Sequence, residues 1–401
     1  MRESLHGMAG AKLVFPLYIF FCLALTLAAG EYALRTMFPF DAWPVYESDA
    51  HAIAVPRKNY AHQTSEGWWQ TNSLGARGKE LDVTAETIFV MGDSNIAARF
   101  AEESVTFPVQ LAALTSKQVV NFGVPGYGPD QSVARLETLL SASRLTRLQA
   151  VILHVFADND LGDLIRNALP RFDTYQDQAI WREPILSYLG DTAGQSVFLH
   201  KVQNQLLKSR LGRWIAPDNY YFPPPPSLQE PGPTLIDKLV AEQLRSFAEY
   251  RKRRFTAWYV DYYDAAIALE VNPELTKAAV ETLGRVLRTF LDLSRRHGFC
   301  PLVVIQPSEI DIAKTNYVSA DDLIAYARRH GHSYEPRRLT RLIEQAASDA
   351  AVPVLSLFDA FEGGAFYYTH DEMPGDNHWN PAGMAEAAKL AARYLGQSCI
   401  K

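Results

Sequence analysis

The chain has 401 residues, of which 48% are hydrophobic and 21% charged, a composition typical of a globular protein with ample apolar material for a core. Its net charge of −6 argues against a dedicated nucleic-acid-binding protein, because such proteins carry a concentrated basic excess. The one basic cluster, at 251–254, lies within a helical pattern and is interpreted as a solvated helix face.

The first predicted element is an uncharged apolar run from Leu13 to Gly30, about long enough to cross a bilayer as a helix. Arg2 and Lys12 precede the run and Glu31 follows it, which favours a cytoplasmic N-terminus with the rest of the chain exported. Residues 1–30 are therefore predicted to be a membrane anchor. A cleaved signal peptide is the alternative, because the run ends in small residues that a signal peptidase accepts.

Beyond this run, short apolar stretches alternate with helical patterns, as in a parallel sheet covered by helices. Five strands are predicted, at 87–93, 118–124, 150–157, 301–307 and 353–360. Residues 107–116 and 132–143 carry apolar side chains at three- and four-residue steps and are predicted to be helices between strands. The predicted fold class is therefore α/β, a three-layer α/β/α sandwich with a five-stranded parallel sheet.

The segment between the third and fourth predicted strands is too long for one crossover helix. Residues 163–285 are therefore predicted to be a largely helical insertion in a domain at 86–400, which follows an N-terminal extension at 31–85. The proline-rich stretch 220–234 is interpreted as a stiff connector. An aromatic stripe follows it at helical steps and is interpreted as core packing, or as a sugar-stacking surface if it is exposed beside Ser94: Phe255, Trp258, Tyr259 and Tyr262.

The three cysteines show no metal-binding spacing. Cys22 lies in the apolar run, so only Cys300 and Cys399 remain for a disulfide, which an exported domain would permit. The sequence does not establish that their backbones approach closely enough, and two inert buried thiols are the default interpretation. Neither a metal nor a cofactor is predicted.

Polar residues follow several predicted strands, at the sheet edge where α/β active sites gather. Ser94 follows the first strand, and Asp376 and His378 lie in a loop after the fifth. Residues two apart in an extended segment project to one side, so Asp376 can reach the His378 ring and leave Nε2 free to take the proton of a serine hydroxyl. Ser94 is thus a candidate nucleophile. Capping the following helix is the alternative interpretation.

Such a nucleophile also needs donors for an oxyanion. The Ser94 N–H, the Gly126 N–H after the second strand and the Asn159 amide after the third are the candidates. Gly126 could instead only shape a turn with Pro125, and Asn159 could form an Asx-turn.

The blocks GDS, N-x-G-x-x-G, N-D and D-x-H follow one another at predicted strand ends, and this ordered set resembles the SGNH/GDSL hydrolase family. The resemblance covers about residues 86–160 and 290–400 and implies a flavodoxin-like fold. It also implies a role for each of five residues: Ser94 as nucleophile, Gly126 and Asn159 as oxyanion donors, His378 as general base and Asp376 as the acid that orients it.

The chain departs from the family pattern at Asn95, where many members have an aliphatic residue, at Ala157, where glycine is usual, and in its short Asp–His spacing. The sequence DNHWNPAG at 376–383 is similar instead to a branch that includes alginate and other exopolysaccharide O-acetylation proteins.

The segment TNSLGARG at 71–78 is similar to one in membrane-anchored relatives. Its Asn72 and Arg77 could line the site, or Gly75 and Gly78 could simply hold a turn.

The apolar run indicates an exported, membrane-anchored protein. The resemblance implies a serine esterase or O-acyltransferase that acts on acyl esters, acetyl most of all, of an envelope or secreted polysaccharide. The expected partners are an acylated carbohydrate, the membrane and other envelope polysaccharide-modification proteins, with no nucleic acid. A lipid or lysophospholipid esterase is one alternative. A catalytically inactive binding or assembly protein of polysaccharide export is the other.

Overall fold

The computed structural model of the chain describes residues 18–30, 32, 46–49, 52–64, 67–142, 147–172, 267–268, 270, 273–309, 311–312, 335–362, 364–368 and 378–399. The chain divides into two units, Met1–Pro44 with Trp181–Pro223, and Val45–Ile180 with Pro224–Lys401. All the strands that the structure describes belong to the second unit.

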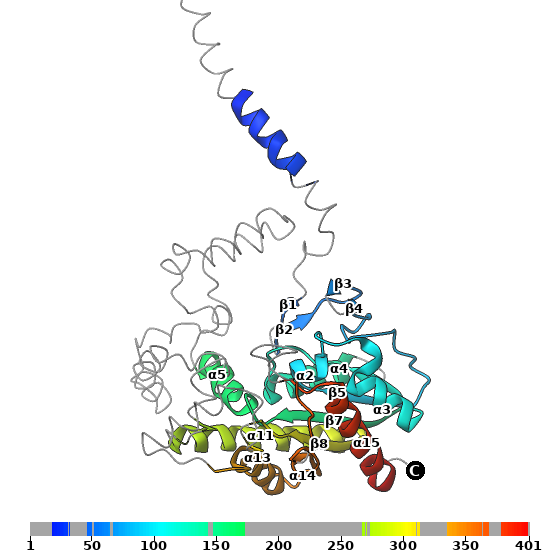
Figure 1. Ribbon diagram of the computed structural model, residues 1–401, viewed down its shortest axis with the longest axis vertical. Helices are drawn as coiled ribbons and strands as arrows, with labels where there is room; N and C mark the ends of the chain where they lie inside the picture. The colour runs from blue at the N-terminus through cyan, green and yellow to red at the C-terminus, as the bar shows by residue number, and fades with distance from the viewer. Residues whose placement is uncertain are drawn as a thin grey trace, which may run out of the picture. The chain divides into compact units, whose positions relative to one another are not determined.

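A five-stranded parallel sheet forms the centre of the second unit (Figure 1). Its strands are β5 (Thr87–Met91), β6 (Gln118–Asn121), β7 (Leu148–Phe156), β8 (Cys300–Gln306) and β9 (Val354–Ser356). They lie in the order β6-β5-β7-β8-β9, with every neighbouring pair parallel. Numbered along the chain, this order is 2-1-3-4-5, that of flavodoxin-like folds. The predicted sheet is confirmed, and each strand overlaps its predicted range.

The fifth strand is shorter than predicted. Residues 358–360 were expected to continue it, but Phe358–Phe361 forms the short helix α14. Phe358 and Phe361 are both buried, and their three-residue spacing suits one face of a helical turn and not the alternation of a strand.

Helices cover both faces of the sheet (Figure 1). On one face α3 (Phe107–Thr115) packs against α15 (Pro381–Ser398), and on the other α11 (Pro273–His297) packs with α4 (Pro129–Ala142), α5 (Asp160–Phe172) and α13 (Arg338–Asp349). Ile88 and Val90 of β5 belong to the same core cluster as residues of α3 and α15, and the intervening Phe89 is equally buried. Because strand side chains alternate, both faces of the sheet are covered. The predicted sandwich and its helices at 107–116 and 132–143 are therefore confirmed.

Two antiparallel hairpins precede the sheet, and the sequence patterns did not predict them. They pair β1 (Tyr46–Asp49) with β2 (Ile53–Pro56), and β3 (Ala61–Thr64) with β4 (Gly67–Gln70). Helix α4 holds this region through two side chains. Gln131 donates from Nε2 to the Ala52 carbonyl at 3.0 Å, and the Arg135 guanidinium donates to the Gly75 carbonyl at 2.9 Å. Arg135 also donates to the Phe122 carbonyl at 3.0 Å, so the described part of the extension that it binds lies near the carboxyl end of β6.

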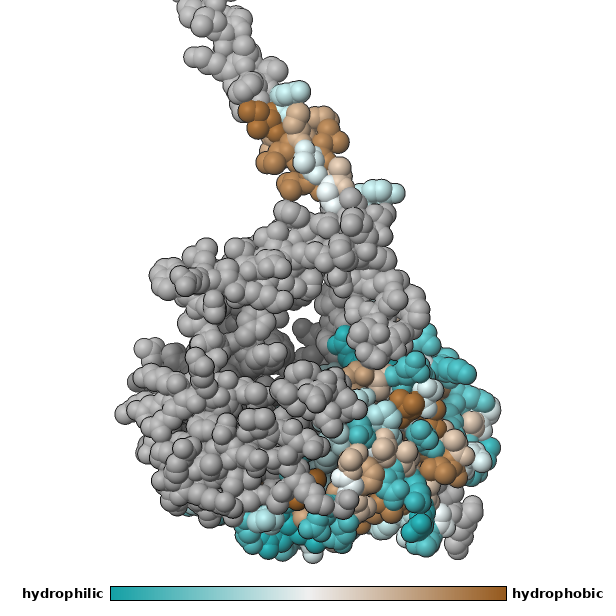
Figure 2. All heavy atoms as spheres, viewed as in Figure 1, coloured by the Kyte–Doolittle hydropathy of each residue, from teal (hydrophilic) through white to brown (hydrophobic). Residues whose placement is uncertain are grey.

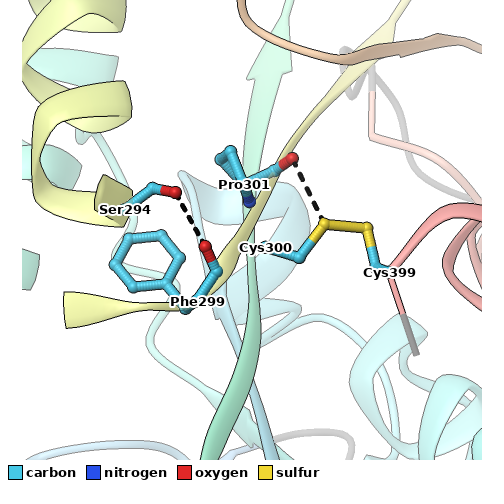
Figure 3. The surroundings of a disulfide bond; sticks show 5 residues. All are labelled: Ser294, Phe299, Cys300, Pro301 and Cys399. Carbon is cyan, nitrogen blue, oxygen red and sulfur yellow. Dashed lines mark hydrogen bonds between the residues drawn. A yellow bond between two sulfur atoms is a disulfide. The ribbon is translucent and has the colours of Figure 1, made fainter. Parts of the chain in front are cut away.

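A disulfide joins the start of β8 to the end of α15 (Figure 3). The Cα atoms of Cys300 and Cys399 lie 5.6 Å apart, across a sequence separation of 99 residues. Beside it, the Ser294 hydroxyl donates to the Phe299 carbonyl at 2.7 Å. The default interpretation of two unpaired thiols is therefore wrong, because the sheet and its last helix bring the two backbones within bonding distance.

Residues 18–30 form a helix, blue in Figure 1, with exposed and mostly apolar side chains (Figure 2). Phe20 is 70% exposed and Phe21 is 62% exposed. Among the described residues, no helix combines the length and hydropathy needed to span a membrane. Residues 13–17 lie outside the described part of the chain, so the anchor stays a prediction.

Most of the predicted insertion at 163–285 also lies outside the described residues. Its first residues belong to α5 and its last to α11. The proline-rich stretch and the four aromatic residues from Phe255 to Tyr262 are not among the described residues, and their interpretation stays open.

Cys399→Ser should lower the free energy of unfolding by about 2–4 kcal/mol, because the disulfide restricts a long loop of the unfolded chain. Denaturant unfolding of the full-length protein measures the change. Cys22→Ser is the matched control, since Cys22 is a free thiol in the N-terminal helix and its loss should leave the value unchanged. Equal stability of Cys399→Ser and wild type would contradict a stabilising bond.

Candidate active site

Ser94 lies at the carboxyl end of β5, in the first turn of the short helix α2 (Ser94–Ala97). The cap of that helix is Asp93, whose Oδ1 accepts the Asn95 N–H at 2.9 Å. The alternative interpretation of Ser94 as the helix cap is therefore wrong. Its half-buried hydroxyl is left to make another contact.

That contact is with His378. The His378 Nε2 lies 2.7 Å from the Ser94 Oγ, although the two residues are 284 positions apart in the chain. The His378 ring packs against the Phe100 ring, with 4.4 Å between centroids, and the His378 carbonyl accepts the Tyr368 N–H at 3.2 Å. An imidazole nitrogen at this distance can accept the serine proton during nucleophilic attack.

Asp376 lies outside the described residues, so its predicted contact with His378 stays a prediction. Within the described part of the chain, no three His, Cys, Asp or Glu side chains are placed to hold a metal ion.

Gly126 sits in a tight turn at the same edge of the sheet. The Tyr127 N–H donates to the Val124 carbonyl at 3.1 Å across Pro125 and Gly126, and Gly126 has φ +78°. Proline followed by a left-handed glycine is the pattern of a type II turn. The alternative interpretation, in which Gly126 shapes a turn with Pro125, is therefore confirmed. It is compatible with a role of the Gly126 N–H as an oxyanion donor. Val124 N–H donates to the Gly92 carbonyl at 3.0 Å, which keeps this turn beside the Ser94 segment.

The backbone N–H groups of Ser94 and Gly126 have no acceptor among the described residues. The first N–H groups of any helix lack intrahelical partners, so that of Ser94 is open to a ligand oxygen. Their role as oxyanion donors stays a prediction.

Asn159 lies in the turn between β7 and α5. Its Nδ2 donates to the Asp163 Oδ2 at 3.2 Å, while its Oδ1 has no hydrogen-bond partner in the described part of the structure. Because an Asx-turn needs Oδ1 to accept a backbone N–H, that alternative interpretation is wrong. An amide nitrogen carries two hydrogens, so Asn159 retains one donor for a ligand.

Gly123, in the same block as Gly126, has a role that the sequence analysis missed. A Cβ at this position would lie 2.3 Å from the Ala97 nitrogen and 2.6 Å from the Ile96 carbonyl carbon. These atoms belong to the backbone of α2, so only glycine allows the loop after β6 to approach the helix that carries Ser94.

Asn72 and Arg77 hold backbone in place, which differs from the interpretation in which they line the site. The Asn72 Oδ1 accepts the N–H groups of Leu74 and Ala76 at 2.9 and 3.0 Å. Gly75 has φ +72°, so the alternative interpretation of this segment as a turn is confirmed.

Arg77 binds the carboxyl end of α2. Its guanidinium donates to the carbonyls of Ala97 at 2.7 Å, of Ala101 at 3.0 Å, and of Ala98. The Ala97 carbonyl is one of the acceptors that a helix end leaves without intrahelical partners. The other two carbonyls belong to the turn that follows, in which the Ala98 carbonyl also accepts the Ala101 N–H. Burial lowers the pKa of Arg77 to about 10, with the Glu103 charge opposing this shift and Arg99 adding to it. The side chain is therefore still a cation at neutral pH.

A layer of buried polar side chains lies behind Ser94: Asp93, Asn95, His154 and Gln306. Burial raises the pKa of Asp93, but the hydrogen bonding and charge of His154, the charge of His378 and the hydrogen bond from Asn95 lower it by more, so the pKa lies below its ordinary value. His154 and Gln306 were missed in the sequence, where each stands next to a run of apolar strand residues.

No protein-family model matches the chain, and no curated protein matches it in sequence. Among solved structures it is similar to the psychrotrophic esterase EstA from Pseudoalteromonas sp., with 10% identity, coverage of 78% of this chain and 97% of that chain, and a TM-score of 0.33. A carbohydrate esterase family 2 enzyme with a carbohydrate-binding domain from Corynascus thermopiles gives 10% identity, 80% and 69% coverage and a TM-score of 0.33. The SGNH-hydrolase family esterase AlinE4 gives 17% identity, coverage of 41% of this chain and 96% of that chain, and a TM-score of 0.17. At these TM-scores the similarity supports no conclusion about the chemistry of the chain.

Arg77→Met should lower the free energy of unfolding by about 2–3 kcal/mol, because buried carbonyl oxygens lose a charged donor. Chemical denaturation followed by circular dichroism measures the loss. The exposed Lys79→Met provides the control and should change the value by no more than about 0.5 kcal/mol. Equal effects of the two substitutions would show that the Arg77 contacts do not stabilise the fold.

Proposed function

We propose that the chain is a serine esterase or acyltransferase in which Ser94 is the nucleophile and His378 the general base. The observation that carries the proposal is the 2.7 Å contact between Ser94 Oγ and His378 Nε2 at the carboxyl edge of a parallel sheet. A serine hydroxyl is a weak nucleophile near neutral pH, and an imidazole at this distance is what activates it.

In the proposed reaction, Ser94 Oγ attacks the carbonyl carbon of an ester as its proton passes to His378 Nε2. The N–H groups of Ser94 and Gly126 and the amide of Asn159 hold the oxyanion, and Asp376 orients the imidazole. The carbon–oxygen bond to the alcohol then breaks, and His378 returns the proton to the leaving oxygen. Water or a sugar hydroxyl, deprotonated by His378, then attacks the acyl carbon. The bond from that carbon to Ser94 Oγ breaks as His378 returns the proton to Oγ, and the acyl group leaves as a carboxylic acid or as a sugar ester.

We further propose that this reaction takes place outside the cytoplasm, with the apolar N-terminal segment as a membrane anchor. The Cys300–Cys399 disulfide supports export, because such bonds persist in oxidising compartments. The exposed apolar side chains at 18–30 support an anchor, because a membrane would remove them from water.

The proposed substrate is an acyl ester, with acetyl first, on an envelope or secreted polysaccharide. Its support is the order Asp376, His378, Trp379, which is similar to that of exopolysaccharide O-acetylation proteins. The apolar helix at 18–30 favours a second candidate, a lipid esterase, since an anchor would hold the enzyme against lipid.

A serine-directed phosphonate should label the wild-type protein and leave Ser94→Ala unlabelled, because the label bonds to the nucleophilic oxygen. Intact-mass spectrometry measures labelling. Hydrolysis of a small activated acetyl ester should fall by roughly 10³-fold or more in Ser94→Ala and in His378→Ala, as removal of such groups does in serine hydrolases. A wild type without labelling or hydrolysis would favour the non-catalytic binding protein.

Wild-type protein incubated with an acetylated polysaccharide should release acetate or move acetyl to an added deacetylated glycan. Mass spectrometry follows both products, with Ser94→Ala as the control. A parallel incubation with lysophospholipid tests the second candidate. Release of fatty acid from lysophospholipid with no change in the glycan would overturn the polysaccharide proposal.

A further inference from the structure

The residues that follow the proposed nucleophile and the proposed base are bonded directly to each other. Asn95 follows Ser94, and Trp379 follows His378. The Trp379 backbone N–H donates to the Asn95 Oδ1 at 3.2 Å, and its indole Nε1–H donates to the Asn95 carbonyl at 3.1 Å. Each partner is one peptide unit from a reacting group, so these bonds constrain the distance between Ser94 Oγ and His378 Nε2.

The orientation of the Asn95 amide is fixed by its partners. A backbone N–H can only donate, so the atom facing Trp379 is the oxygen. The Asn95 Nδ2 consequently faces Asp93 and donates to its Oδ2 at 3.1 Å. The Gln306 Nε2 lies 3.4 Å from the same Asn95 Oδ1. Both ends of the buried amide are therefore used.

The same reasoning extends to His154. With its nitrogen toward Asn95, Gln306 presents Oε1 to the His154 Nε2 at 2.9 Å, so this ring nitrogen donates. The opposite nitrogen, Nδ1, lies 3.5 Å from the Asp93 Oδ1. This nitrogen makes no hydrogen bond within the described residues. Asp93 instead accepts two hydrogen bonds from Asn95, one from its backbone N–H and one from its Nδ2, and thereby holds the Asn95 amide in place.

Trp379 is a rigid partner for Asn95. Its side chain is fully buried, stacked on Phe107 with 5.6 Å between ring centroids and 5.0 Å from the His154 ring. The next residue, Asn380, caps α15 by accepting the Gly383 N–H at 3.0 Å. Trp379 thus connects the proposed base to the core and to a long helix.

We propose that Asn95 is a positioning residue, whose amide joins the segment of His378 to the turn of Ser94 and holds the two reacting atoms at hydrogen-bond distance. The inference rests on the proposed function in that it gives Asn95 a part in the same site, without contact with substrate. Leucine, which has nearly the same shape, offers neither an acceptor for Trp379 nor a donor for Asp93. Aspartate keeps the acceptor but places a second carboxylate against Asp93.

The test compares full-length wild type, Asn95→Leu, Asn95→Asp, and the double variant Asp93→Asn with Asn95→Asp, which exchanges the amide and the carboxylate. With a small activated acetyl ester, Asn95→Leu and Asn95→Asp should each lower kcat roughly 100-fold, with KM changed by no more than about threefold, because small displacements of reacting groups cost rates of this order. The exchange should recover at least about tenfold of the loss in Asn95→Asp, since it restores a donor opposite a carboxylate. Ile343→Val, a buried substitution in α13, is the control for general loss of packing and should keep kcat.

Crystal structures of wild type and Asn95→Leu give a second measurement that does not need activity. The Ser94 Oγ to His378 Nε2 distance should lie within hydrogen-bond range in wild type and beyond it in the variant. A folded Asn95→Leu with kcat within about threefold of wild type, an unchanged distance in the variant, or an exchange no more active than Asn95→Asp would each overturn the inference. If wild type neither hydrolyses esters nor reacts with phosphonate, the proposed function fails, and the crystallographic distance alone decides on Asn95.

Discussion

The geometry of the site depends on one hydrogen bond between residues that are 284 positions apart, Ser94 and His378. No local structure can bring them together. They meet because β5 and β9 are parallel members of one sheet, so that the segments after both strands emerge at the same edge. The order 2-1-3-4-5 places β5 inside the sheet, where β6 and β7 flank it and deliver Gly126 and Asn159 to that edge. The carboxyl edge therefore determines which residues can act together.

Behind this edge the core is polar, which is energetically costly unless every group has a partner. Asp93, Asn95 and Gln306 form a continuous set of contacts that reaches His154 on one side and Trp379 on the other. Because each group has few acceptable partners, such a network permits few arrangements of the two segments that it joins. An apolar core of equal volume would tolerate sliding of the base segment against the nucleophile turn. The buried polar groups thus restrict how the Ser94 and His378 segments lie relative to each other, which offsets the free energy needed to bury them.

The sequence predicted the parts of the fold that depend on local patterns. Five apolar runs with helical segments between them identified the sheet, and polar residues after those runs identified Ser94 and His378. The sequence could not predict contacts that depend on tertiary structure. Cys300 and Cys399 come together only when the end of α15 lies beside the start of β8. The backbone carbonyls that Arg77 binds likewise cannot be identified from a single sequence. Asn95 looked like a departure from the family pattern, yet it is the residue that bonds to Trp379. A polar residue in an apolar strand, such as His154, is the signal that could have revealed the buried layer.

The described part of the N-terminal extension supports the helix that carries Ser94. Helix α2 is only four residues long, and it ends at Ala98, a non-glycine residue with φ +47° in the left-handed region. A helix this short has little stability of its own, and the left-handed residue adds strain. External partners hold it: the Arg77 guanidinium bonds the carbonyls at its carboxyl end, and the Asn121 Nδ2 donates to the Ile96 carbonyl at 2.8 Å. The Arg77 N–H donates to the Asn121 carbonyl at 2.9 Å, which joins these two supports to each other. The position of Ser94 is therefore determined from both ends of α2, by the buried amide of Asn95 at its start and by the extension at its end.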